Sequence, residues 1–248
     1  MKTSKATAVA LLLATLLAPS VGTSADDGSQ HVEIAGKMDP EWASYRYAYE
    51  ASVFTHKFLR KRPLIQTQMQ LRPLDPATPV TGLKVTLAGA KTNLVLEADD
   101  MGLVDVPQLK QAYDEDAVLR LNRPKGLYKF SGRFSIKERD DGVYGIADLQ
   151  DACEQLMGAQ RESGYRLRLW GKKCVGVKFA YPVAASGVSA DVHASDDHVT
   201  PVAAVDGHPF EDDSMGTYKI VVVRFADWPK SGRVVTHDKP LSIGTLYE

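Results

Sequence analysis

The strongest constraint on the fold is the alternation of apolar and polar side chains over residues 65–72 and 127–138. Successive side chains of a β-strand point to opposite faces, so this period of two predicts half-buried strands. Gly132 interrupts the apolar side of the second stretch, which predicts a bulge or a close backbone approach there. Both stretches are expected to place one face on a hydrophobic core.

Shorter stretches with the same pattern follow, separated by residues that favour turns. Further strands are expected at residues 83–87, 93–98, 103–107, 118–121, 165–170, 174–181, 217–225 and 232–246. Gly, Pro and Asp residues lie between them, which is typical of antiparallel strands joined by short connections. The chain is therefore expected to be rich in β-structure.

Two segments show helical periodicity instead. Residues 38–63 are bounded by Asp39 as a cap, Pro40 in the first turn and Pro63 after the end. Residues 146–161 carry an apolar stripe and end at Ser163-Gly164. The expected fold class is mainly β with two helices (α+β), an antiparallel β-sandwich-like domain with the helices packed on one side.

The N-terminal residues are typical of a secretory leader. Lys2 and Lys5 precede an uncharged run at residues 6–18, and small residues at 23–25 suit cleavage. The run is too short to span a bilayer, which needs about 20 residues. We therefore expect an exported protein, periplasmic or secreted, without a transmembrane span.

The pattern predicts a simple domain organisation. The expected parts are a signal peptide at 1–25, a polar leader at 26–38, a β-rich domain at 39–181, an acidic, histidine-containing linker or loop at 182–216 and a C-terminal pair of strands at 217–248. The last pair either joins the main sheet or forms a small appendage. The whole chain has a formal charge of −1, and loss of Lys2 and Lys5 leaves −3. This charge disfavours nucleic acid as a partner.

Cys153 and Cys174 are the two cysteines of the chain. In an oxidising compartment such a pair favours a disulfide. The alternative is a nucleophilic Cys174, made acidic by Lys172 and Lys173, in a hydrolase or transpeptidase.

Residues 191–213 combine seven carboxylates and three histidines without Lys or Arg. Nitrogen and oxygen donors of this kind suit zinc or copper, and the candidate ligands are His193, Asp197, His198 and His208. Small polar residues surround them, which favours a solvated connector over a closed metal site. No other cofactor is expected.

An aromatic stripe in the first helical segment is the candidate ligand groove. Trp42, Tyr45 and Tyr49 recur at helical spacing, and Arg46 lies beside them. Exposed rings near a guanidinium would bind a sugar or peptide, whereas buried rings would belong to the core.

The same segment ends in Lys57, Arg60, Lys61 and Arg62. Positive charge at a helix end offsets the carbonyl dipole, and it would equally suit an anionic surface such as a phosphorylated glycolipid.

The stretch "GLKVTLAGAKTNLVLEADDMGLVDVP" contains a strand ending at Gly89, then Asp99, Asp100, Gly102 and Pro107. In this order of features, residues 66–122 resemble the carboxypeptidase-regulatory-like and transthyretin-like β-sandwich modules. The resemblance implies an immunoglobulin-like sandwich that packs or binds without catalysing a reaction. It assigns no family to the whole chain.

The sequence contains no G-x-S-x-G elbow, phosphate-binding glycine loop, H-E-x-x-H pattern or calcium loop. We therefore expect a non-enzymatic binding or envelope-associated domain, whose partner is an envelope protein or glycan. Metal binding by residues 191–213 and cysteine chemistry at Cys174 are the alternatives.

Overall fold

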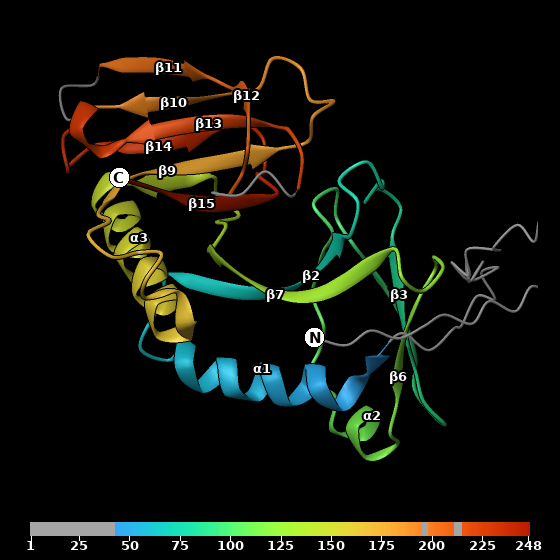
Figure 1. Ribbon diagram of the computed structural model, residues 1–248. Coiled ribbons are helices and arrows are strands. Elements are labelled where there is room, and N and C mark those ends of the chain that lie inside the picture. The colour runs from blue at the N-terminus through green and yellow to red at the C-terminus, as the bar shows by residue number, and fades with distance from the viewer. Residues whose placement is uncertain (1–42, 195–197, 211–214) are drawn as a thin grey trace, which may run out of the picture. The chain divides into compact units, whose positions relative to one another are not determined.

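The computed structural model describes residues 43–194, 198–210 and 215–248, whose strands form three antiparallel sheets (Figure 1). The predicted signal peptide and polar leader lie outside the described residues. Two longer helices and one short helix accompany the sheets in the described part of the chain. The fold is mainly β with an α+β, sandwich-like arrangement, as the alternating patterns predict. In the described ranges, no helix is long and apolar enough to cross a membrane.

The largest sheet has seven strands. Their order is β12 (Val205–Gly207), β13 (Tyr218–Arg224), β9 (Cys174–Tyr181), β15 (Ser242–Tyr247), β7 (Tyr128–Ile136), β2 (Ile65–Pro73) and β5 (Leu103–Val104). β2 and β7 form its longest ladder, which runs from Ile65 opposite Ile136 to Pro73 opposite Tyr128. Antiparallel partners place their side chains on the same face, so the two alternating stretches together make one apolar and one polar face.

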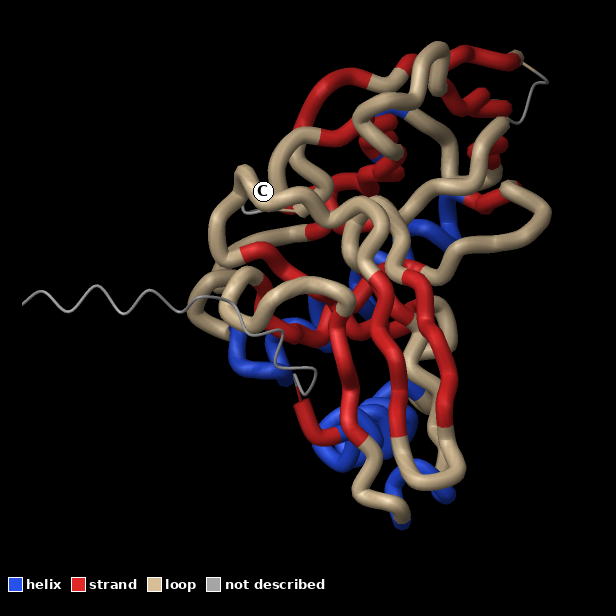
Figure 2. The backbone as a smooth tube through the Cα atoms, turned by 90° about the vertical axis from the view of Figure 1, so that its right-hand side faces the viewer, coloured by secondary structure: helices blue, strands red, loops and turns tan. Residues whose placement is uncertain are grey.

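Two four-stranded sheets complete the β-structure. One has the order β1 (Ala43–Ser44), β6 (Val118–Leu121), β3 (Lys84–Ala88) and β4 (Asn93–Glu97). The other has the order β11 (Val199–Ala203), β10 (Ser189–His193), β14 (Arg233–Thr236) and β8 (Val143–Gly145). Figure 2 shows strands of the first of these sheets side by side, nearest the viewer.

Residues 182–216 contain strands where the sequence predicts a connector. β10 and β11 form a hairpin, β10 also pairs with β14, and β12 pairs with β13. Ala190 and Val192 are fully buried. These strands are short and rich in small or polar residues, so pairing with neighbouring strands specifies them more than a local apolar pattern does. Of the C-terminal strands, β13 and β15 belong to the main sheet, where they flank β9 on either side. The predicted strand at 232–246 divides into β14, which joins the four-stranded sheet with β10 and β8, and β15.

The first helix, α1 (Tyr45–Leu59), begins later than the sequence predicts. Ala43 and Ser44 pair with β6, and the Ser44 hydroxyl then caps the helix by accepting a hydrogen bond from the Arg46 amide at 3.3 Å. Asp39 and Pro40, the predicted start, lie outside the described residues. α3 (Ile146–Gln160) matches its predicted bounds, whereas the short α2 (Lys110–Asp114) was not predicted.

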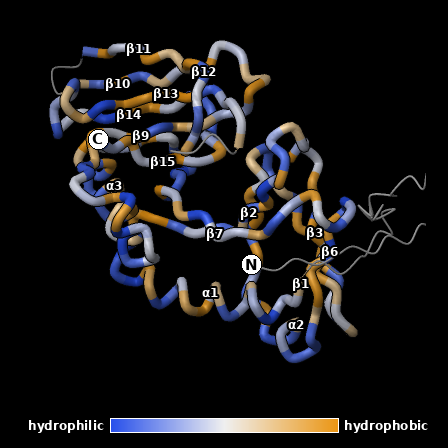
Figure 3. The backbone as a smooth tube through the Cα atoms, viewed as in Figure 1, coloured by the Kyte–Doolittle hydropathy of each residue, from blue (hydrophilic) through white to orange (hydrophobic). Residues whose placement is uncertain are grey.

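The core divides into clusters on different sheets. α3 packs its apolar face, including Leu149 and Leu156, against Phe179 and Ile243 of the seven-stranded sheet. A second cluster joins the four-stranded sheet that contains β3 and β6 to Tyr45 of α1 and Tyr128 of β7. Figure 3 shows β13 as hydrophobic over much of its length, and Val221 and Val223 on this strand are fully buried.

A disulfide joins α3 to β9 and confirms the predicted pair. Cys153 in the helix and Cys174 at the start of the strand have Cα atoms 6.2 Å apart. Both are held by this bond, so the described chain has no free cysteine. A nucleophilic Cys174 needs a thiolate, which the bonded sulfur does not provide.

Residues 165–170, predicted as a strand, form helical turns instead. After α3 the segment η1 (Arg161–Tyr165) is kinked at Gly164, which has a φ of 103°, and the Leu169 amide then donates to the Tyr165 carbonyl at 3.1 Å. The Trp170 amide donates to the Leu167 carbonyl at 3.3 Å. These bonds close within the segment, so the backbone is satisfied without a neighbouring strand. Alternation of arginines with apolar residues here therefore does not reflect a half-buried strand.

Reduction of the disulfide is expected to destabilise the protein by roughly 3 kcal/mol, because a separation of 21 residues then adds conformational freedom to the unfolded chain. Urea unfolding of the Cys153→Ala/Cys174→Ala variant would measure the difference. The matched comparison is wild-type protein with and without dithiothreitol. Equal midpoints for all three samples would show that the bond does not stabilise the fold.

Asp99 organises the turn between β4 and β5. One carboxylate oxygen accepts hydrogen bonds from the Met101 and Leu103 amides, each at 2.8 Å. Gly102 has a φ of 71°, and a Cβ there would lie 2.5 Å from the Leu71 carbonyl oxygen, so only glycine fits. Despite the two amide donors, burial raises the pKa of Asp99 from 3.8 to about 6.

Folding stability is therefore expected to fall as the pH rises from about 4 to 7, because the folded state holds the Asp99 proton to higher pH than the unfolded state. Asp99→Asn keeps an acceptor for both amides and removes most of this slope. Glu138, whose pKa is also raised by burial, accounts for the remaining slope in the same direction.

Urea unfolding at several pH values would measure this effect, which is at most roughly 3 kcal/mol for two pKa units. Asp141→Asn is the matched control, because the Arg139 guanidinium lowers the pKa of the exposed Asp141 to about 2. That carboxylate is ionised in both states above about pH 5, so its replacement leaves the slope unchanged. Equal slopes for wild type and Asp99→Asn would contradict the assignment.

Candidate functional site

A cavity of about 480 Å³ lies between α1 and the β2–β7 ladder. Figure 1 shows α1 running along one side of these two strands. Short side chains line the cavity on this side, namely Ala43 and Ser44 of β1 and Ala48, Ala51, Ser52 and Thr55 of α1. Short side chains cannot fill the space between a helix and a sheet, so the sequence of this helix face creates the cavity.

Gly132 forms part of the cavity wall on β7. It pairs with Met69 in the uninterrupted β2–β7 register, and a Cβ added to Gly132 would meet no atom within 4 Å. The predicted bulge or close backbone approach is therefore wrong. The missing side chain leaves a gap on the apolar face between Phe130 and Phe134, which are cavity-lining residues two positions away on either side.

The cavity wall combines apolar surface with several polar side chains, namely Ser44, Ser52, Thr55, Thr67, Gln68, Asp105, Ser131 and Arg133. Ser52 is one of these, and its hydroxyl oxygen is buried without a hydrogen-bond partner in the described part of the chain. By contrast, the Thr55 hydroxyl donates to the Ala51 carbonyl at 2.7 Å. At the edge, Gln68 donates to Asp105 at 3.0 Å, and Tyr47 is 76% exposed. The Ser52 hydroxyl is therefore a buried polar group behind the cavity wall, whereas Gln68 and Asp105 offer polar atoms at its edge.

The described residues of the predicted ligand groove lie on α1, but their side chains contact neighbouring parts of the protein and do not line the cavity. Trp42 lies outside the described residues. Tyr45 is buried, where its hydroxyl donates to the Pro107 carbonyl at 2.5 Å and accepts from the Leu109 amide at 2.8 Å. Burial raises the pKa of the Tyr45 hydroxyl, which keeps it protonated.

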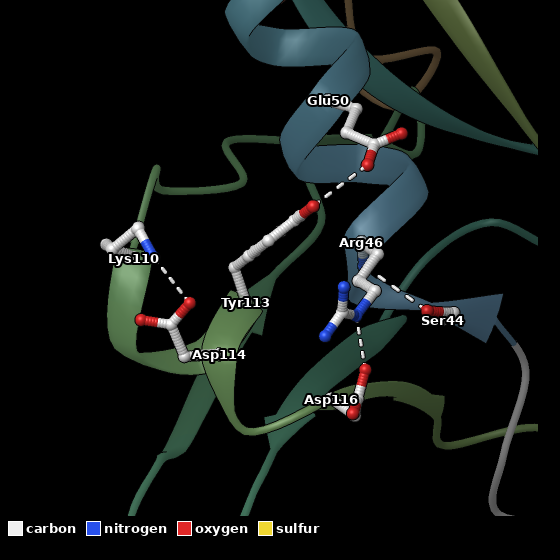
Figure 4. A network of polar contacts seen from close by, with 7 residues as sticks. All are labelled: Ser44, Arg46, Glu50, Lys110, Tyr113, Asp114 and Asp116. Atoms are coloured by element: carbon white, nitrogen blue, oxygen red, sulfur yellow. Dashed lines mark hydrogen bonds and ion pairs between the residues drawn. The ribbon is translucent and has the colours of Figure 1, made fainter.

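Arg46 and Tyr49 belong to the contact between α1 and α2. Figure 4 shows the Arg46 guanidinium directed toward Asp116, with which it forms an ion pair. The guanidinium also lies 4.6 Å from the ring centre of Tyr113, whose centre is 4.8 Å from that of Tyr49. These residues fix the helix in place, and the cavity lies beside different residues of the same helix.

The predicted metal ligands are distributed over two sheets. His193 ends β10 and His198 precedes β11, so both lie at one hairpin, with Asp197 outside the described residues. His208 follows β12 in the seven-stranded sheet, and its Nδ1 lies 2.9 Å from the Gly216 carbonyl oxygen. Among the described residues, no group of three or more His, Cys, Asp or Glu side chains is arranged to hold a metal ion.

A second, smaller cavity of about 130 Å³ lies where β15 separates from β7. These strands are paired only at Ile243 and Ile136 in the described sheet. Arg72, Arg133 and Arg168 line this space, and no motif in the sequence marks them as site residues. Arg133 also lies over the Phe210 ring, 3.6 Å from its centre.

The chain matches no family model, no curated protein and no solved structure. The site is therefore interpreted from its own geometry.

Replacement of Ser52 by Ala is expected to stabilise the protein by about 1–2 kcal/mol, because it removes a buried hydroxyl without a protein partner and favours the helix. Thr55→Ala is the matched control, since it makes the same kind of change at a hydroxyl that already has an acceptor. Chemical unfolding of both variants would measure the difference. No gain for Ser52→Ala over Thr55→Ala would show that water satisfies the Ser52 hydroxyl.

Proposed function

We propose that this protein is an exported, non-enzymatic binding protein of the cell envelope whose ligand occupies the cavity between α1 and the β2–β7 ladder. The observation that carries the proposal is the cavity itself, whose 480 Å³ suits a small molecule. Short helix residues and Gly132 create this space without any break in the strand register.

The lining indicates the chemical class of the ligand. Met69, Phe130 and Phe134 supply apolar surface, and Ser52 supplies one buried hydroxyl without a partner in the described chain. An amphipathic small molecule fits this lining, because the apolar walls favour burial and polar side chains such as Gln68 and Asp105 orient the ligand.

Export is supported by the leader-like residues 1–25 and by the disulfide. A bond between Cys153 and Cys174 persists in an oxidising compartment such as the periplasm or the extracellular space. The bonded Cys174 gives no support to a cysteine-dependent enzyme. The separation of His208 from His193 over two sheets gives no support to the predicted four-ligand metal site.

The test is titration of the protein with N-phenyl-1-naphthylamine, an apolar fluorescent probe of suitable size. We expect saturable binding to wild type and at least about tenfold weaker binding to Gly132→Ile and to Ala48→Leu, which fill the cavity from the strand and from the helix. Gly132 has an ordinary strand conformation, so isoleucine is compatible with its backbone.

Gly158→Ala in α3 is the matched control, because a Cβ there also meets no atom within 4 Å and the residue does not line this cavity. Circular dichroism and thermal unfolding of each variant would separate loss of binding from loss of fold. Equal probe affinity for wild type, Gly132→Ile and Ala48→Leu, with all three folded, would exclude this cavity as the binding site.

A further inference from the structure

The segment between α3 and β9, residues 161–173, exposes large apolar side chains. Leu167 is 82% exposed, Trp170 is 81% exposed and Tyr165 is 52% exposed. Leu167 and Trp170 are the most exposed large apolar side chains in the described part of the chain. We name this segment the basic loop. Clustered exposure of this kind marks an interaction surface more often than a solvated one.

The backbone holds these side chains in place. Leu169 is 2% exposed and anchors the loop in the protein, while the helical turns around it direct its neighbours outward. The disulfide closes the loop at Cys174. Next to it, Lys173 and Glu248 exchange two backbone hydrogen bonds, of 2.8 and 3.1 Å. An anchored loop loses less conformational freedom on binding than a flexible one.

The basic loop is strongly positive in a chain whose formal charge is −1. It contains Arg161, Arg166, Arg168, Lys172 and Lys173 and a single acidic residue, Glu162. Glu162 is paired with Arg62, which follows α1, and this pair brings the basic end of that helix next to the loop. That helix end also carries Lys57, Arg60 and Lys61, whose charge equally suits an anionic surface.

This combination of side chains identifies the partner by its chemistry. Arginine and lysine complement phosphate groups at a surface, and exposed Trp and Leu side chains gain by entering an apolar layer beneath them. Tryptophan in particular favours the boundary between lipid headgroups and acyl chains. A nucleic acid offers the phosphates but no apolar layer for Leu167.

We propose that the basic loop docks on the surface of an anionic lipid bilayer, with Leu167 and Trp170 entering the headgroup boundary and the basic side chains contacting lipid phosphates. This peripheral contact uses residues that do not line the cavity between α1 and the sheet. It places the protein at a membrane surface.

The experiment is sedimentation of the purified full chain with vesicles of phosphatidylcholine alone or mixed with phosphatidylglycerol. We expect wild type to bind the mixed vesicles and salt to weaken this binding. Two variants are expected to bind the mixed vesicles at least about tenfold more weakly than wild type. Leu167→Ser/Trp170→Ser removes the apolar contact, and Arg166→Glu/Lys172→Glu reverses charge. Every variant carries the same N-terminal residues, so differences between variants report the loop alone.

Two matched controls place the same changes elsewhere on the surface. Leu74→Ser/Val183→Ser replaces exposed apolar residues, and Lys91→Glu/Lys129→Glu reverses exposed charges outside the loop. Both are expected to bind like wild type. Vesicle binding that survives Leu167→Ser/Trp170→Ser, or equal binding to neutral and anionic vesicles, would overturn the proposal. The affinity for N-phenyl-1-naphthylamine is expected to be unchanged in the loop variants. This titration therefore tests the proposed ligand cavity separately from the proposed membrane contact.

A second readout is the fluorescence of Trp170, obtained as the difference between wild type and Trp170→Phe. Entry into the headgroup boundary is expected to shift this emission to shorter wavelength with mixed vesicles only. A different outcome would assign the loop to nucleic acid and overturn the proposal. In that case the protein would bind duplex DNA but not vesicles, and DNA binding would be lost in Arg166→Glu/Lys172→Glu and kept in Leu167→Ser/Trp170→Ser.

Discussion

The antiparallel ladder between β2 and β7 determines where the candidate site can form. Its register fixes which side chains share a face, so that Met69 and Gly132 lie opposite each other on the face directed to α1. A shift of one residue would turn that face over and place Gln68 and Gln70 against the helix. The cavity therefore depends on backbone pairing before it depends on any single lining residue.

The periodicity of apolar residues predicted the long strands and the helix α3, in which that periodicity is strong. The alternation at residues 65–72 and 127–138 and the apolar stripe at 146–161 gave the long ladder and α3 with nearly correct bounds. The strands within residues 182–216 were missed because they are short and rich in small or polar residues, so they lack the apolar alternation by which the other strands were recognised. The alternation at 165–170 predicted a strand wrongly, because nothing in a local pattern shows whether a neighbouring strand edge is present.

The candidate site was less predictable than the fold. Helical spacing correctly grouped Tyr45 and Tyr49 with the contact side of α1, but it could not show that α2 covers that side. The cavity faces the small residues of the helix, and a run of Ala, Ser and Thr carries no signal by itself. Gly132 was the one residue in the sequence that pointed to this site, because it interrupts an apolar strand face. Whether it marks a bulge or a gap depends on the element that packs over that face. The space above it became apparent only once the helix was in place.

The magnitude of the cavity decides how it must be occupied. An enclosed apolar void of 480 Å³ would cost on the order of 10 kcal/mol at about 24 cal/mol per Å³, as much as the whole stability of an ordinary domain. The protein therefore requires a cavity that communicates with solvent, and the exposed Tyr47 in its lining shows where access lies. Water against the apolar wall is readily displaced, so an apolar ligand gains affinity mainly by releasing it. The same reasoning explains why filling the space at Gly132 should remove binding while sparing the fold.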